Sequence, residues 1–99
     1  MTDPTAQALG AAFALVRHAR ELLPIDDPTG EADFQRAELL DLEDLLQPLD
    51  PPLVDVPAPA STDEALDEAA RRLDQPEVRP GVPLVIWAAL SEVRGRRRR

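Results

Sequence analysis

The chain contains no cysteine, lysine, asparagine or tyrosine, and only three of its 99 residues are aromatic. Without cysteine there is no disulfide, no thiolate nucleophile and no sulfur-bound zinc, which excludes a disulfide-stapled secreted scaffold. We therefore expect an intracellular, cytoplasmic protein. Because aromatic rings are scarce, the core has to consist of leucine, valine and alanine, and a chain of this length supports a single domain.

Long hydrophobic runs are missing as well. The longest near-apolar run in the first 30 residues, 11–16, lacks the basic start and the apolar centre of about 7 to 15 residues that a signal peptide needs. The other apolar run, 82–90, is far shorter than the roughly 20 residues that cross a bilayer as a helix. We expect neither export by a signal peptide nor a membrane partner.

The formal net charge of −8 is unevenly distributed. Residues 24–78 carry 16 carboxylates against three arginines, whereas residues 79–99 carry six arginines against one carboxylate. An acidic body of this density repels nucleic acid, so only weak nucleic-acid contacts are expected. These would be made by the last four residues, Arg96, Arg97, Arg98 and Arg99. A well-solvated surface is the simpler interpretation of the same carboxylates.

Proline and glycine divide the chain into segments with helical periodicity. The first predicted helix begins at Asp3 and Pro4, where a capping carboxylate precedes a proline, and it ends before Pro24. Its apolar residues recur three and four positions apart and form a wide, alanine-rich face. A face of this width predicts a helix at the centre of a bundle or at a self-association seam.

The second predicted helix spans residues 31–47 and is closed by Pro48. Most of its large apolar residues fall within one arc of the helix surface. The arc contains Phe34, Leu39, Leu42, Leu45, Leu46 and Leu49, and the carboxylates Asp33, Glu43 and Asp44 lie outside it. Two residues break the pattern, since Glu38 falls inside the arc and Leu40 outside it. This mismatch predicts a second contact surface, with Leu40 exposed in the monomer.

Residues 48–60 contain five prolines in 13 positions and predict an extended connection. Four apolar side chains are interspersed among the prolines, and a purely flexible spacer has little use for them. We expect the segment to lie along the bundle surface and to bury some of these side chains. A mobile linker is the alternative.

Two more helices are predicted after this connection. The first of these helices is predicted to begin with a capping box at Ser61. In this motif the Ser61 hydroxyl accepts from the Glu64 amide, and the Glu64 side chain reaches back to the Ser61 amide. This helix is predicted to be short and peripheral and to end before Pro76. The last segment, 82–94, is ambiguous because its β-branched residues favour a strand, but its alanines favour a helix that is capped at Gly95. We prefer the helix.

No residue pattern is typical of a catalytic, cofactor or metal site. The serines and threonines lack a nucleophile motif, and His18, the single histidine, is best interpreted as a solvated or hydrogen-bonded flank residue. The acidic stretch 26–33 does not follow the order of a calcium loop, and the four glycines do not cluster into a phosphate loop. We predict no catalytic residue, cofactor or metal ligand, and hence a protein that is not an enzyme.

These patterns predict an all-α fold, a small three- to four-helix bundle with a proline-rich extended connection. The helical domain covers residues 1–94, with the connection 48–60 inside it, and a basic tail follows over residues 95–99. The functional hypothesis is a small acidic accessory or adaptor protein whose amphipathic helices bind a larger protein partner or a second copy. The residues expected to bind the partner are Leu39, Leu40, Leu42, Leu45, Leu46, Ile86, Trp87 and Leu90. The alternative is an acidic inhibitor, a nucleic-acid mimic or an antitoxin-like protein, that occupies a basic site on its target.

Overall fold

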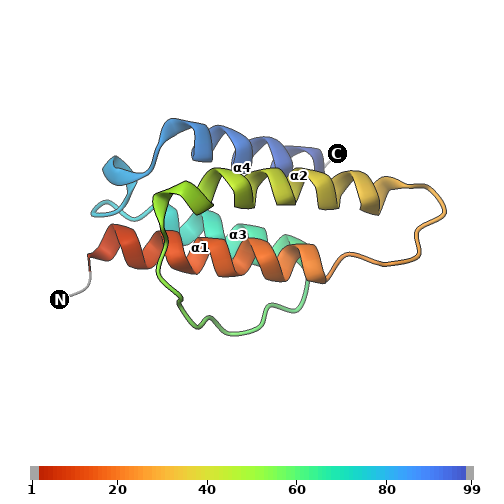
Figure 1. Ribbon diagram of the computed structural model, residues 1–99, viewed down its shortest axis with the longest axis horizontal. Helices are drawn as coiled ribbons and strands as arrows, with labels where there is room; N and C mark the ends of the chain where they lie inside the picture. The colour runs from red at the N-terminus through yellow and green to blue at the C-terminus, as the bar shows by residue number, and fades with distance from the viewer. Residues whose placement is uncertain (1–2, 98–99) are drawn as a thin grey trace.

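The computed structural model describes residues 3–97 of the chain. Within them, four α-helices form a bundle (Figure 1). The helices are α1 (Pro4–Glu21), α2 (Glu31–Leu46), α3 (Thr62–Leu73) and α4 (Leu84–Arg97), and two 3-10 turns are η1 (Gln47–Leu49) and η2 (Arg79–Gly81). No strand occurs in this part of the chain, so the expected all-α bundle is confirmed, as is the helix preferred for the last segment. None of the helices in residues 3–97 has the length and apolar character needed to cross a membrane.

Each helix packs against two neighbours. Both α1 and α4 contact α2 and α3. After α1 and α2 have run in opposite directions, residues 50–60 form a crossover that returns the chain alongside α1, so α3 runs parallel to α2 and α4 runs back (Figure 1). The C-terminal ends of α1 and α4 therefore meet the N-terminal ends of α2 and α3 at one end of the bundle.

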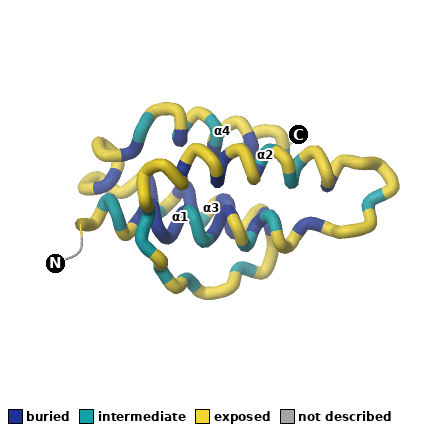
Figure 2. The backbone as a smooth tube through the Cα atoms, in the orientation of Figure 1, coloured by how far each residue is buried: buried dark blue, intermediate teal, exposed yellow. Residues whose placement is uncertain are grey.

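The most extensive helix contact lies between α1 and α3. Alanines on both helices, such as Ala12, Ala19, Ala65 and Ala69, are buried in one core cluster. Their small side chains allow the two backbones to approach closely. Figure 2 shows the buried residues on the inner sides of the helices. Six of the 12 residues of α3 are buried, so α3 is a central element and the prediction of a peripheral helix is wrong.

The orientation of α2 differs from the prediction. Leu39, Leu42 and Leu46 are buried as expected, whereas Phe34, Leu45 and Leu49 are exposed. Glu43, expected outside the apolar arc, is only 7% exposed, because α2 turns it toward α1. There the Arg20 Nε donates to the Glu43 Oε2 at 2.6 Å. This hydrogen bond raises the pKa of Arg20, and the guanidinium compensates the buried carboxylate.

Side-chain caps fix the start of α1 and of α3. The Asp3 carboxylate accepts from the Thr5 amide at 3.2 Å, and the Ser61 hydroxyl accepts from the Glu64 amide at 3.1 Å, as predicted. The Glu64 carboxylate accepts from the amide of Ala60 at 2.9 Å rather than from that of Ser61. The capping box of α3 is therefore closed one residue earlier than predicted.

The crossover lies against α1, which confirms the expected packing of the proline-rich segment. Pro52, Val54 and Val56 are half-buried, while Leu53 and Asp55 between them are exposed, Leu53 to 98%, so alternate side chains face the bundle. The contact depends on Gly10. A Cβ at this position would overlap the carbonyl oxygen of Pro52 and lie 2.7 Å from the Val54 Cγ2. Glycine thus lets the crossover backbone touch the helix backbone.

The end of α4 differs from the prediction. The helix continues through Gly95 to Arg97, and Gly95 does not have the positive φ of a left-handed cap, so the predicted cap is wrong. Arg96 and Arg97 belong to the last helical turn and pair with carboxylates on other helices. The remaining residues of the expected basic tail, Arg98 and Arg99, lie outside the described residues.

Candidate functional site

Most of the side chains predicted to bind a partner lie in the core. Five of the eight are at most 2% exposed and hold the helices together, namely Leu39, Leu42, Leu46, Ile86 and Leu90. In this conformation they expose almost no surface, although Leu42 lines the groove described below. The other three are Leu40, Leu45 and Trp87, and these differ in their surroundings.

Leu40 is 42% exposed, which confirms the prediction that it faces solvent in the monomer. Trp87 is half-buried and packs against the core, and the Arg79 guanidinium lies 5.4 Å from the centroid of its ring. The Trp87 Nε1 is buried and has no hydrogen-bond acceptor among the described residues. Trp87 therefore covers the core near η2, and it is not a free docking surface.

A groove of about 320 Å³ runs between α2 and α4. We call its apolar lining the floor and its charged lining the rim. The floor consists of Phe34, Ala37, Leu42, Leu45, Ala89 and Val93, and the rim consists of Glu38, Asp41, Glu92 and Arg96. Phe34 is the most exposed of the large floor residues, with 59% of its surface open to solvent. The groove thus combines solvent-accessible apolar surface with charge of predominantly one sign.

Arg96 is the one cation of the rim. Its guanidinium pairs with Glu38 on α2 and with Glu92 on its own helix. It also lies over the Phe34 ring, 5.7 Å from the ring centroid. Asp41, one turn beyond Glu38, makes no ion pair among the described residues, so the rim keeps an excess of negative charge.

The prediction from sequence includes only Leu42 and Leu45 from this groove. On α2 the groove residues follow positions 34, 38, 41 and 45, and on α4 they follow 89, 92 or 93 and 96. These three- and four-residue spacings are a readable signal that each set shares one helix flank. The spacing within each helix does not predict that the flanks of α2 and α4 face each other.

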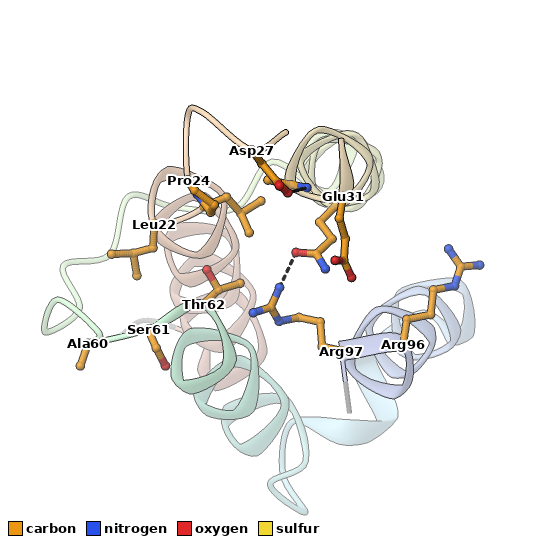
Figure 3. Close-up of a pocket in the computed structure, with 12 residues that line it drawn as sticks. Leu22, Pro24, Asp27, Glu31, Ala60, Ser61, Thr62, Arg96 and Arg97 are labelled. Atoms are coloured by element: carbon orange, nitrogen blue, oxygen red, sulfur yellow. Dashed lines mark hydrogen bonds between the residues drawn. The ribbon is translucent and has the colours of Figure 1, made fainter. Parts of the chain in front are cut away.

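A second recess of about 530 Å³ lies at the end of the bundle where the starts of α2 and α3 meet the end of α4 (Figure 3). Arg97 points into it and its Nη1 donates to the Gln35 Oε1 at 2.6 Å. The same side chain pairs with Asp63 in the first turn of α3. Arg97 therefore connects α4 to both α2 and α3.

Two other polar groups of this recess, the side chains of Asp27 and Thr62, hold the chain in place. The Asp27 carboxylate accepts from the hydroxyl and the amide of Thr29 and from the Ala32 amide, and these hydrogen bonds lower the pKa of Asp27. The Thr62 hydroxyl is buried and donates to the Ala19 carbonyl at 2.9 Å. These contacts fix the starts of α2 and α3. The Asp27 carboxylate and the Thr62 hydroxyl therefore serve to stabilise the fold.

No constellation for acid–base or metal chemistry is formed by the described residues. The His18 Nδ1 lies 4.0 Å from the Glu21 Oε2 on the same helix, and no hydrogen bond joins His18 to a hydroxyl group within residues 3–97. Within residues 3–97 no group of three or more histidine, cysteine, aspartate or glutamate side chains could hold a metal ion.

No family model, curated protein or solved structure matches this chain. The groove between α2 and α4 is therefore the candidate functional site on its own geometry.

Proposed function

We propose that this chain is a small, acidic, cytoplasmic adaptor or accessory protein without catalytic activity, and that it binds a larger protein partner through the α2–α4 groove. The observation that carries the proposal is the apolar floor of that groove, with Phe34 and Leu45 exposed inside an acidic rim. Grooves between helices are a common seat for an amphipathic helix of a partner.

The position of Phe34 supports a protein ligand. Full burial of an exposed phenylalanine contributes about 1.5 to 3 kcal/mol, so completing the burial of a half-exposed one at a concave site contributes about half of that. Aromatic side chains in such positions commonly dominate the energetics of protein interfaces. Leu53 is more exposed than Phe34, but it projects singly from the crossover, where no recess surrounds it.

The non-catalytic part of the proposal is supported by how the reactive groups are used. The Ser61 hydroxyl caps α3, and the Thr62 hydroxyl is bonded to a backbone carbonyl. The Asp27 carboxylate caps α2. A hydroxyl or carboxylate in such a role serves helix stability and is poorly placed to attack a substrate.

Site-specific photocrosslinking tests the proposed interface. We expect p-benzoylphenylalanine at position 34 to crosslink one larger chain in cells, and Leu45→Ser to reduce that crosslink. The matched control is the same photoreactive residue in place of Leu53, which is more exposed yet outside the groove. Equal yields from the two positions, or no larger chain captured from position 34, would contradict binding through the groove.

An acidic inhibitor of a basic site is the second candidate, and one observation favours it. Asp41 in the groove rim and Asp44 elsewhere on α2 are both exposed and make no ion pair among the described residues, and the chain has a net charge of −8. Such an inhibitor would lose affinity steeply when salt rises from about 0.05 to 0.5 M, whereas binding through the apolar floor changes far less. Asp44→Asn would weaken only the inhibitor mode, and Phe34→Ser only the adaptor mode.

A further inference from the structure

The chain places its own arginine in the groove. Resting on the proposed function, we infer that the α2–α4 groove recognises an arginine of its partner next to apolar anchors, and that Arg96 is an internal occupant of this arginine site. The partner segment is then an amphipathic helix with leucine-like side chains for the floor and one arginine for the rim.

The geometry around Arg96 is that of a guanidinium site. Its donors face Glu38 and Glu92, which belong to two different helices, and its flat face covers the ring of Phe34. A planar guanidinium can satisfy two carboxylates and stack on an aromatic ring at the same time, which the compact lysine ammonium does less well. The site therefore favours arginine over lysine.

The charge of the rim indicates that the site can take a cation from outside. With Arg96 in place, three carboxylates face one guanidinium, and Asp41 makes no ion pair among the described residues. A neutral or acidic segment would leave this excess uncompensated, whereas a basic segment neutralises it. Charge complementarity thus selects a basic amphipathic helix as the occupant.

Arg96 is also easy to displace. It lies in the last described turn of α4, and its side chain is 42% exposed. Its partner Glu92 is 61% exposed, whereas its partner Glu38 is 15% exposed. Exposed ion pairs of arginine are weak because water solvates both partners and a long side chain must be held in place. A partner that brings its own arginine together with apolar anchors can therefore replace Arg96, which swings into solvent.

Two short amphipathic helical peptides test this inference. Both carry leucines three and four residues apart and a fluorescein label, and they differ in one residue, arginine or its neutral isostere citrulline. Fluorescence anisotropy with the full chain is expected to show the arginine peptide binding about threefold more tightly. In Arg96→Gln, where the internal occupant is gone, the ratio should widen to about tenfold.

Glu38→Gln should reduce the difference between the two peptides, because it removes one of the two carboxylates that pair with the guanidinium in this site. Arg94→Gln is the matched control, because Arg94 lies on the same helix but pairs with Asp67 outside the groove, and it should not alter the ratio. Circular dichroism of each variant verifies that the helices are retained.

The outcomes separate this inference from the proposed function. Equal binding of both peptides, weakened by Phe34→Ser, would keep the docking groove and overturn the arginine site. Binding that is insensitive to Phe34→Ser, or absent for both peptides, would overturn both. A dimer in sedimentation analysis that Phe34→Ser dissociates would identify a second copy as the occupant, and would also overturn the arginine-bearing partner.

Discussion

The α1–α3 side and the α2–α4 side of the bundle fill the space between their helices with different residues. Between α1 and α3 lie buried alanines, and the crossover packs against α1 from outside. Between α2 and α4 the apolar side chains are larger, charged pairs border them, and none of the described segments covers the groove. The small residues between α1 and α3 are buried entirely within the chain, whereas Phe34 and Leu45 leave exposed apolar surface in the α2–α4 groove that another molecule can bind.

Truncating a leucine on each side gives the largest contrast. Leu66→Ala on α3 removes a side chain that is 1% exposed and should lower the free energy of unfolding by about 3 kcal/mol, because a cavity remains. Leu45→Ala in the groove should cost less, about 1 to 2 kcal/mol, because 36% of this residue is already exposed to water and no closed cavity remains. Urea unfolding measures both, and equal losses would mean that the two sides are packed alike.

Adding a methyl group to a glycine on each side gives the next largest effect. Gly10→Ala places a Cβ against the crossover backbone and should cost about 2 kcal/mol. Gly95→Ala in α4 meets no atom within 4 Å and should stabilise the chain by up to about 1 kcal/mol, because alanine favours helix. Thermal unfolding gives the sign of each change, and a stabilising Gly10→Ala would show that the crossover is not held against α1.

Removing the cap of α3 should have a smaller effect. Ser61→Ala deletes the acceptor for the Glu64 amide, and a side-chain N-cap of this kind contributes about 1 kcal/mol. Ser91→Ala, at an exposed position of α4, is the matched control and should change stability by less than about 0.5 kcal/mol. If the unfolding midpoint of Ser61→Ala matches that of the control, the hydroxyl does not stabilise the start of α3.

The smallest predicted effect is a pH dependence at the start of α2. Because its hydrogen bonds lower the pKa of Asp27 in the folded state, its contribution is fully present above the unfolded-state pKa of about 3.9 and is lost as the pH falls through the folded-state value. Asp27→Ala should therefore be less stable than the parent at about pH 7, and the difference in stability should shrink as the pH falls through the folded-state pKa of Asp27. Asp26→Ala is the control, and a gap that persists at low pH would exclude this origin.

The sequence predicts well those features that depend on residues close together along the chain. Asp3 and Pro4 begin α1 where expected, and Ser61 caps α3, because the donor and acceptor of a cap lie within three residues. The four helices follow from periodicity interrupted by proline. The closed box at Ala60 rather than Ser61 differs by a single residue, within the reach of one glutamate side chain.

The features that sequence misses depend on helices far apart in the chain. The position of a residue on the helical arc does not predict that Glu43 pairs with Arg20 or that Phe34 contacts Arg96 of α4. Both contacts depend on how α2 is oriented between its neighbours. The sequence predicts that the helix ends at Gly95. In the structure α4 continues past Gly95, and Arg96 and Arg97 form ion pairs with residues of α2 and α3. The groove could not be predicted from the pattern of either helix alone, because it forms only where α2 and α4 pack together.

The crossover also governs how quickly such a chain can fold. The hydrogen bond from Thr62 to Ala19 joins residues 43 positions apart, and that from Arg97 to Gln35 joins residues 62 apart. Here α1 packs most extensively against α3, and forming this interface closes a loop that contains α2 and the crossover. Contacts of such long sequence separation slow the search for the native state, so folding should be slower than in a bundle of equal size with purely sequential helix pairs.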